Sequence, residues 1–201
     1  TFIDQWLRAD IKDIKAYHVP SSKNMLKMDA MESPFGIPED LKQDFLDCIA
    51  QAQVNRYPDS NAEELHTTIR NLMDIPNDLG VLLGNGSDEL IQLLAMACNS
   101  GDIVMSFEPS FVMYEMVAKF TQLNYQGIKL NDKFEIDLEN TLKAITINKP
   151  KLIFIAYPNN PTGNSFDYEA IKEIIKSTDS LVVLDEAYYA YSDKSFLAEI
   201  M

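Results

Sequence analysis

Short apolar segments alternate with amphipathic helical segments over most of this chain, and no other feature of the sequence constrains the fold as strongly. From residue 80 onward, segments with the character of buried strands occur at 80–83, 103–107, 125–130, 151–157 and 181–185. Apolar residues recur at helical spacing between them, at 88–98, 112–123, 138–147 and 168–176. Strands that alternate with helices form a mostly parallel sheet with helices on both faces. The sequence therefore predicts an α/β fold.

The first third of the chain has a less regular pattern. Apolar residues between 3 and 14 share one helical face, which predicts an N-terminal helix followed by an extended arm. A second helix is expected to begin near Pro38. Ser60 and Glu63 match a capping box that would open a third helix. We expect two domains, residues 1–74 with the arm and helices, and residues 75–201 with the sheet, incomplete at its C-terminus.

Composition excludes several classes of function. The chain has 17 Lys and Arg against 31 Asp and Glu, and this net charge of −14 argues against nucleic acids and anionic membranes as partners. The apolar runs are far shorter than the roughly 20 residues of a membrane span. His18 and His66 lack neighbouring Cys or His, so no metal is expected. Cys48 and Cys98 are expected to be packed thiols in a reducing compartment, the cytoplasm.

The first candidate ligand site follows the segment 80–83. Ligands of open α/β sheets bind beyond the carboxyl ends of the strands. There the sequence reads Gly84-Asn85-Gly86-Ser87-Asp88-Glu89 and opens a helix, whose free amides could bind a phosphate. The third glycine of a dinucleotide fingerprint and the Gly-Lys-Ser/Thr of a Walker loop are both missing. The alternative is that Ser87 or Asp88 simply caps the helix.

Aromatic, amide and carboxylate side chains follow three other predicted strands. Phe111, in Pro109-Ser110-Phe111, could stack on a flat cofactor ring, or it could be a core aromatic together with Tyr114. The turn Pro158-Asn159-Asn160-Pro161-Thr162-Gly163 presents an amide at a fixed angle. Asp185 ends an apolar strand, where a carboxylate needs a partner. It could cap the next turn or meet a cationic ring nitrogen, with Tyr188 three residues further on.

These motifs, in this order and spacing, resemble those of the pyridoxal-phosphate-dependent aminotransferases with the aspartate aminotransferase fold. The N-terminal part resembles the histidinol-phosphate aminotransferases in particular, through Ala16-Tyr17-His18-Val19, Lys27-Met28-Asp29-Ala30, Pro34-Phe35-Gly36 and Asn55-Arg56-Tyr57-Pro58. The resemblance implies that residues 1–74 form part of a small domain and that residues 75–201 form most of the large domain, which binds pyridoxal 5'-phosphate.

The resemblance also implies a role for each matched residue. The cofactor phosphate would be bound by Ser87 and Asp88, and the ring would stack on Phe111. Asn160 and Tyr188 would hydrogen-bond the phenolic oxygen, and Asp185 would pair with the protonated ring nitrogen, which makes Asp185 and Tyr188 the expected catalytic residues. A tyrosine at the position of Tyr57 reaches the cofactor phosphate of the neighbouring subunit, which implies a homodimer, and Tyr17 would close over the substrate.

The implied reaction moves an amino group between histidinol phosphate and 2-oxoglutarate or glutamate, in histidine biosynthesis. Two departures from the family are visible. The arm reads Asp29-Ala30-Met31-Glu32-Ser33-Pro34 where the family has Asn at the third and fifth positions. The family's Schiff-base lysine, which follows a serine well downstream of Tyr188, has no counterpart, so we expect these 201 residues by themselves to be inactive.

Other functions stay open at this stage. An aromatic aminotransferase or a phosphothreonine decarboxylase would have the same fold and differ in the residues around the substrate. A phosphate-binding α/β module without catalysis belongs to a different class, and it would not depend on Asn160, Asp185 and Tyr188 as a group.

Overall fold

The computed structural model describes residues 2–12, 14, 21, 23–27 and 32–200. The chain divides into two compact units, one formed by Thr1–Ala16 together with Leu83–Met201 and the other by Tyr17–Leu82. The first unit contains the sheet and every motif that follows a strand. None of the described helices is long and apolar enough to cross a membrane.

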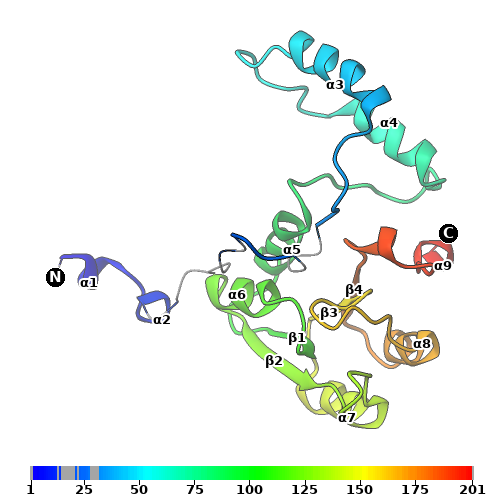
Figure 1. Ribbon diagram of the computed structural model, residues 1–201. Helices are drawn as coiled ribbons and strands as arrows, with labels where there is room; N and C mark the ends of the chain where they lie inside the picture. Colours follow the sequence, from blue (N-terminus) through cyan, green and yellow to red (C-terminus); the bar gives the residue numbers. More distant parts are fainter. Residues whose placement is uncertain (1, 13, 15–20, 22, 28–31, 201) are drawn as a thin grey trace. The chain divides into compact units, whose positions relative to one another are not determined.

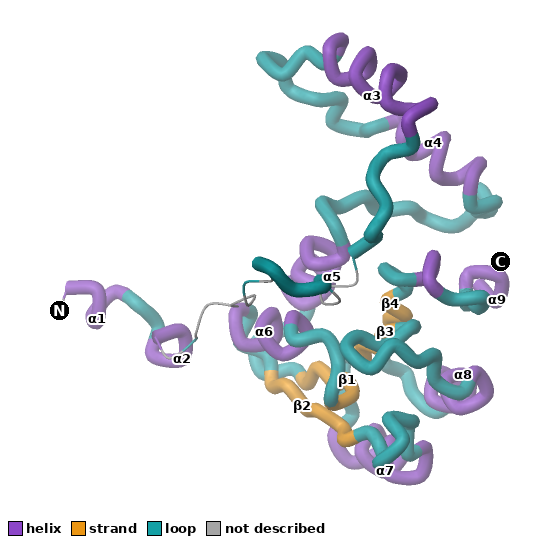
Figure 2. Tube along the Cα trace, viewed as in Figure 1, coloured by secondary structure: helices purple, strands orange, loops and turns teal. Residues whose placement is uncertain are grey.

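The sheet of the first unit is parallel throughout. Its strands are β1 (Ile103–Glu108), β2 (Asn124–Lys129), β3 (Leu152–Ala156) and β4 (Leu181–Asp185), in the order β2-β1-β3-β4 (Figures 1 and 2). The predicted α/β fold is therefore confirmed. β1 pairs with β2 on one side and with β3 on the other, so the direction of winding reverses between β1 and β3. In open α/β sheets, this reversal is the point at which ligands bind.

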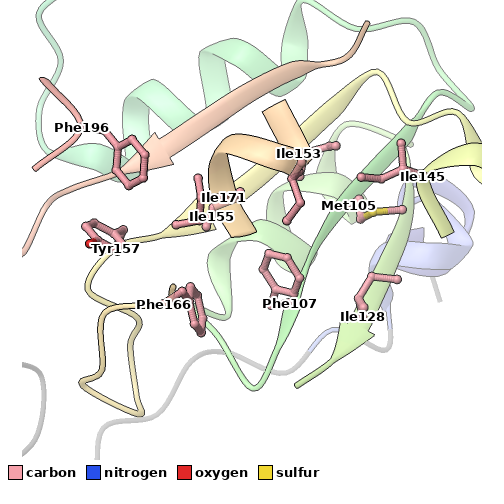
Figure 3. Close-up of a cluster of buried hydrophobic side chains, with 11 residues drawn as sticks. Met105, Phe107, Ile128, Ile145, Ile153, Ile155, Tyr157, Phe166, Ile171 and Phe196 are labelled. Atoms are coloured by element: carbon pink, nitrogen blue, oxygen red, sulfur yellow. The ribbon is translucent and has the colours of Figure 1, made fainter. Parts of the chain in front are cut away.

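Helices cover both faces of this sheet. Buried residues of α5 (Ser87–Met96) and α6 (Met113–Phe120) pack on one face, and those of α7 (Leu138–Asn148) and α8 (Tyr168–Lys176) pack on the other. Side chains alternate along β3, since Phe154 belongs to the buried cluster on the α5 and α6 face and Ile153 and Ile155 belong to the cluster on the α7 and α8 face. Figure 3 shows Ile153 and Ile155 within the cluster on the α7 and α8 face. Every residue of β3 is buried, which explains its uninterrupted apolar sequence.

The predicted strand at 80–83 is wrong, because these residues form no strand in the described part of the chain. Their apolar pattern suits a strand, but a strand exists only through hydrogen bonds to a neighbour, and none of the described strands pairs with this segment. The segment instead leads as an irregular connection into α5.

The capping box predicted at Ser60 is also wrong. Helix α4 (Glu63–Leu72) follows Ala62, and the carboxylate of Asp59 accepts hydrogen bonds from the amides of Glu63 and Asn61, each at 3.0 Å. These two donors hold the pKa of Asp59 below its usual value. A carboxylate satisfies the free amides at this helix start more strongly than a hydroxyl would.

The single helix predicted over 3–14 is two short helices, α1 (Phe2–Trp6) and α2 (Ala9–Lys12). The break lies at Arg8, whose guanidinium donates to the carbonyl oxygens of Lys119 and Phe120, each at 3.0 Å, and also pairs with Asp10. These carbonyls are at the C-terminal end of α6, where a cation satisfies acceptors that the helix leaves open. A long-range contact thus overrides the local helical pattern.

The second unit contains α3 (Glu39–Gln51) and α4, and none of the residues of these helices is buried. Cys48 on α3 is therefore exposed, which contradicts the expected packed thiol, whereas Cys98 in the first unit is half-buried. Both cysteines are free thiols. After β4 the first unit continues with a 3-10 helix (Tyr189–Tyr191) and α9 (Leu197–Ile200).

Two isoleucines of α7 test this core. Ile145 is 4% exposed, whereas Ile147, two residues further along the same helix, is 78% exposed. Ile145→Ala should lower the free energy of unfolding by about 2–5 kcal/mol, because it removes buried contacts and leaves a cavity. Ile147→Ala should change it by less than about 0.5 kcal/mol. Denaturant unfolding of both variants measures the difference, and equal effects would contradict the packing of α7 described above.

Candidate functional site

The segments after β1, β3 and β4 lie at one edge of the sheet, because these strands are parallel neighbours. They carry Ser110 and Phe111, the turn 158–163 and Tyr188, and Asp185 is the last residue of β4. Helix α5 packs over the same sheet through Ile91 and Ala95. The predicted motifs therefore belong to one end of one compact unit.

The start of α5 has the features of an anion site. Its N-cap is Gly86, which has a φ of +81°, a conformation that favours glycine. A glycine has no side chain with which to cap the helix, and Ser87 and Asp88 are already helical residues. The alternative that Ser87 or Asp88 is the N-cap is therefore wrong. Amides in the first turn of such a helix attract negative charge.

Asn159 joins the segments after β1 and β3. This residue is 0% exposed, and its side chain accepts a hydrogen bond from Ser110 Oγ at 2.8 Å. Its Nδ2 donates to the carbonyl of Pro109 at 3.0 Å and to Thr162 Oγ1 at 2.7 Å. A buried amide with this many partners fixes the geometry of both loops.

Asn160, the next residue, differs from Asn159 in its exposure and in its hydrogen bonds. It is half-buried, and its side chain makes no hydrogen bond to any other residue in the described part of the chain. The turn thus uses one asparagine to hold its own shape and presents the other. The sequence singled out Asn160 and gave Asn159 no role of its own.

Asp185 ends β4, and both of its carboxylate oxygens are engaged. Oδ1 accepts from the amide of Ala187 at 3.1 Å, and Oδ2 accepts from Tyr114 Oη at 2.8 Å. The bond to Ala187 is the turn-capping interaction anticipated for this residue, and it coexists with the second bond. A carboxylate has about four acceptor positions, so two donors leave room for a further one.

The electrostatics at this edge favour a cation. Asp88 is exposed, yet partial burial and the negative charge of Asp185 raise its pKa. A positive group placed near Asp88 and Asp185 would relieve the repulsion that raises the pKa of Asp88. Burial and the charge of Asp185 also raise the pKa of Tyr114, so this phenol stays protonated and remains a donor.

Of the four aromatic residues that the sequence nominated, two lie near Tyr114 and two do not belong to the described part of the first unit. Phe111 is half-buried and meets Tyr114 edge to face, with ring centroids 5.7 Å apart at 87°. Tyr188 is half-buried and close enough to Tyr114 to contribute to the raised pKa of that phenol. Tyr57 belongs to the other compact unit and is 100% exposed, and Tyr17 lies outside the described residues.

Glu186 was also missed by the sequence reasoning. Its Oε2 accepts from Ser195 Oγ and its Oε1 from the amide of Phe196, both at 2.6 Å. These bonds tie the segment before α9 back to the end of β4. A carboxylate directly after Asp185 was visible in the sequence, but its partners could not be identified there.

Comparison with known proteins gives a consistent result. The family described as aminotransferase class I and II matches residues 23–200. The chain is 62% identical, over its full length, to the histidinol-phosphate aminotransferase of Vesicomyosocius okutanii subsp. Calyptogena okutanii (strain HA), of which it covers 56%. It is 47% identical over 91% of its length to the histidinol-phosphate aminotransferase of Thiocapsa roseopersicina, of which it covers 98%.

Solved structures have the same fold. The histidinol-phosphate aminotransferase from Clostridium acetobutylicum matches with a TM-score of 0.71 at 28% identity, over 82% of this chain and 49% of that one. The enzyme from Sinorhizobium meliloti, solved in complex with pyridoxal-5'-phosphate, matches with a TM-score of 0.70 at 21% identity, over 80% of this chain and 43% of that one. The chain thus spans about half the length of the V. okutanii relative and of both structures.

The two adjacent asparagines can be separated experimentally. Asn159→Ala should lower the free energy of unfolding by about 1–3 kcal/mol, because it leaves buried hydrogen-bonding groups without a partner. Asn160→Ala, the matched control, should stay within about 0.5 kcal/mol of the parent protein. Denaturant unfolding without added cofactor measures both. A larger loss for Asn160→Ala than for Asn159→Ala would reverse the division of roles between them.

Proposed function

This chain belongs to the class I and II aminotransferase family, which has the pyridoxal-phosphate-dependent fold, and from that premise we propose that it forms the cofactor-binding part of a histidinol-phosphate aminotransferase. The reaction would move an amino group between histidinol phosphate and 2-oxoglutarate or glutamate, in histidine biosynthesis in the cytoplasm. Identity over the full chain to relatives of that name carries the proposal.

The described residues fit pyridoxal 5'-phosphate. The start of α5, where the N-cap is a glycine, suits a phosphate. The raised pKa of Asp88 next to Asp185 indicates that a cationic ring nitrogen would be stabilised there. Phe111 offers a ring for stacking, and Asn160 offers a side-chain amide that bonds to none of the other described residues. When bound, the cofactor supplies an electron sink for the pair left at the substrate Cα.

The chain's own residues would then have distinct tasks. Asp185 would hold a positive charge at the end of β4, in an orientation set by Tyr114 and the amide of Ala187. Asn160 and Tyr188 would donate to the phenolic oxygen, and the backbone amides of Ser87 and Asp88 at the start of α5 would bind the phosphate. The amino and keto acid substrates would bind next to the cofactor.

Three parts of the proposal involve residues beyond this edge of the sheet. We infer a homodimer in which Tyr57 reaches the cofactor phosphate of the neighbouring subunit, and a substrate contact from Tyr17. We also infer that residues 1–74 contribute to a small domain and that residues 75–201 form most of the large domain. The resemblance of the N-terminal motifs to the family supports the roles of Tyr57 and Tyr17 and the small domain, and the motifs after residue 80 support the large domain.

The role of Asp185 can be tested with Asp179, an aspartate near the opposite end of β4, as the control. In the complete natural protein that carries these residues, Asp185→Asn should lower kcat/KM for histidinol phosphate by roughly 10²–10³-fold, because a preorganised charge is lost. Asp179→Asn, at an exposed position just before β4, should have no comparable effect. Steady-state assays with 2-oxoglutarate measure this. Faster turnover of aromatic amino acids than of histidinol phosphate would favour the alternative substrate class.

Residues 1–201 alone should give a different result. They contain no lysine at the family's Schiff-base position, so we expect no transamination and no cofactor band that borohydride fixes to a single lysine. The complete protein should show both. Absorbance spectra and peptide mapping after borohydride treatment compare the two samples, and a single modified lysine within residues 1–201 would refute this assignment of the nucleophile.

A further inference from the structure

Tyr114 is a core residue whose hydroxyl is not needed for packing. Its side chain is 0% exposed, and its ring belongs to the cluster under α5 and α6. Its hydroxyl nevertheless donates to Asp185 Oδ2 at 2.8 Å, across 71 positions of sequence. A phenylalanine would fill the same volume without a hydroxyl to satisfy.

The ring of Tyr114 is held on two sides. It lies parallel to Phe154 of β3, with ring centroids 4.8 Å apart and an angle of 3°, and it meets Phe111 edge to face. β3 lies between β1, which precedes α6, and β4, which ends at Asp185. The phenol therefore extends across the central strand and brings its hydroxyl to the carboxylate at a fixed position.

Asp185 receives its other bond from the backbone of its own turn, through the amide of Ala187. Rotation of the carboxylate would break one bond or the other, so the two donors together define its plane. Neither donor carries a charge, so neither forms an ion pair with the carboxylate of Asp185. The hydroxyl remains a donor because its surroundings keep it protonated.

We propose that Tyr114 is a positioning residue, whose hydroxyl orients Asp185 toward the ring nitrogen of pyridoxal 5'-phosphate while its ring spaces Phe111 from β3. This inference rests on the proposed function and adds a residue to it. Tyr114 acts through Asp185 and does not itself pair with the ring nitrogen. A tyrosine with a purely structural role would affect the binding of all ligands alike. The positioning role of Tyr114 instead predicts an effect only on ligands that pair with Asp185.

The test compares two ligands in the complete natural protein. One is pyridoxal 5'-phosphate, and the other is its analogue with a C–H group in place of the ring nitrogen, which gives Asp185 nothing to pair with. The parent protein should bind the natural cofactor more tightly than the analogue. In Tyr114→Phe, this preference should fall about tenfold, the effect of one hydrogen bond to a charged group. Equilibrium binding of both ligands gives the ratio of dissociation constants without any assay of turnover.

Tyr125→Phe is the matched control. Tyr125 is also a largely buried tyrosine, but its hydroxyl bonds to Ser106 Oγ at 2.8 Å, and Tyr125→Phe should leave the ligand preference unchanged. Asp185→Asn tests the other member of the Tyr114–Asp185 hydrogen bond. It should abolish the preference, and Tyr114→Phe added to it should cause no further loss in the ratio.

Each outcome decides the matter. A parent protein that binds neither ligand, or binds both equally, would refute the proposed function itself. If the parent prefers the natural cofactor but Tyr114→Phe weakens both ligands equally, the proposed function stands and the positioning role fails. A Tyr114→Phe protein that does not fold also counts against the role, because the hydroxyl would then determine folding and not orientation.

Discussion

The parallel pairing of β1, β3 and β4 around a fully buried central strand is the constraint on which the rest of this structure depends. Parallel neighbours end at the same edge of a sheet, so the segments that follow them meet without any special interaction. The winding reverses between β1 and β3, and the carboxyl ends of strands at such a reversal are where ligands of open α/β sheets bind. The candidate site is a consequence of this strand order.

The loops at that edge are held by buried polar groups. Asn159 links the segments after β1 and β3, and Tyr114 links α6 to the end of β4. Both side chains are fully buried, where an unmatched hydrogen-bonding group costs more than a matched one gains. Such groups tolerate only one arrangement of their partners, and this gives the site a defined geometry before any ligand binds.

The sequence predicts the elements of this fold much better than the contacts of the site. β4 and α8 begin and end where the apolar pattern indicates, because burial imposes that pattern locally. The segment 80–83 fails because a strand also needs a partner, which a local pattern does not reveal. Arg8 breaks a predicted helix through carbonyls more than 100 residues away.

The same distinction applies to the candidate site residues. Phe111, Asn160 and Asp185 follow strands, so the position of the strand ends was enough to nominate them. Tyr114 has the spacing of an ordinary core aromatic, and nothing local to it indicates that its hydroxyl meets a carboxylate 71 positions away. Residues expected to contact a ligand are thus easier to identify from the sequence than the residues that hold those side chains in place.

Three carboxylates at this edge show how local surroundings outweigh the net charge of −14. Glu186 is satisfied by a hydroxyl and an amide, and its role is to hold the segment before α9. Asp185 accepts hydrogen bonds from two neutral donors, and partial burial together with the nearby Asp185 raises the pKa of Asp88. An anionic ligand is unfavourable for the chain as a whole. At this edge, however, helix amides would face its phosphate and Asp185 would face its cationic ring, so a ligand with both charges is the kind that the site suits.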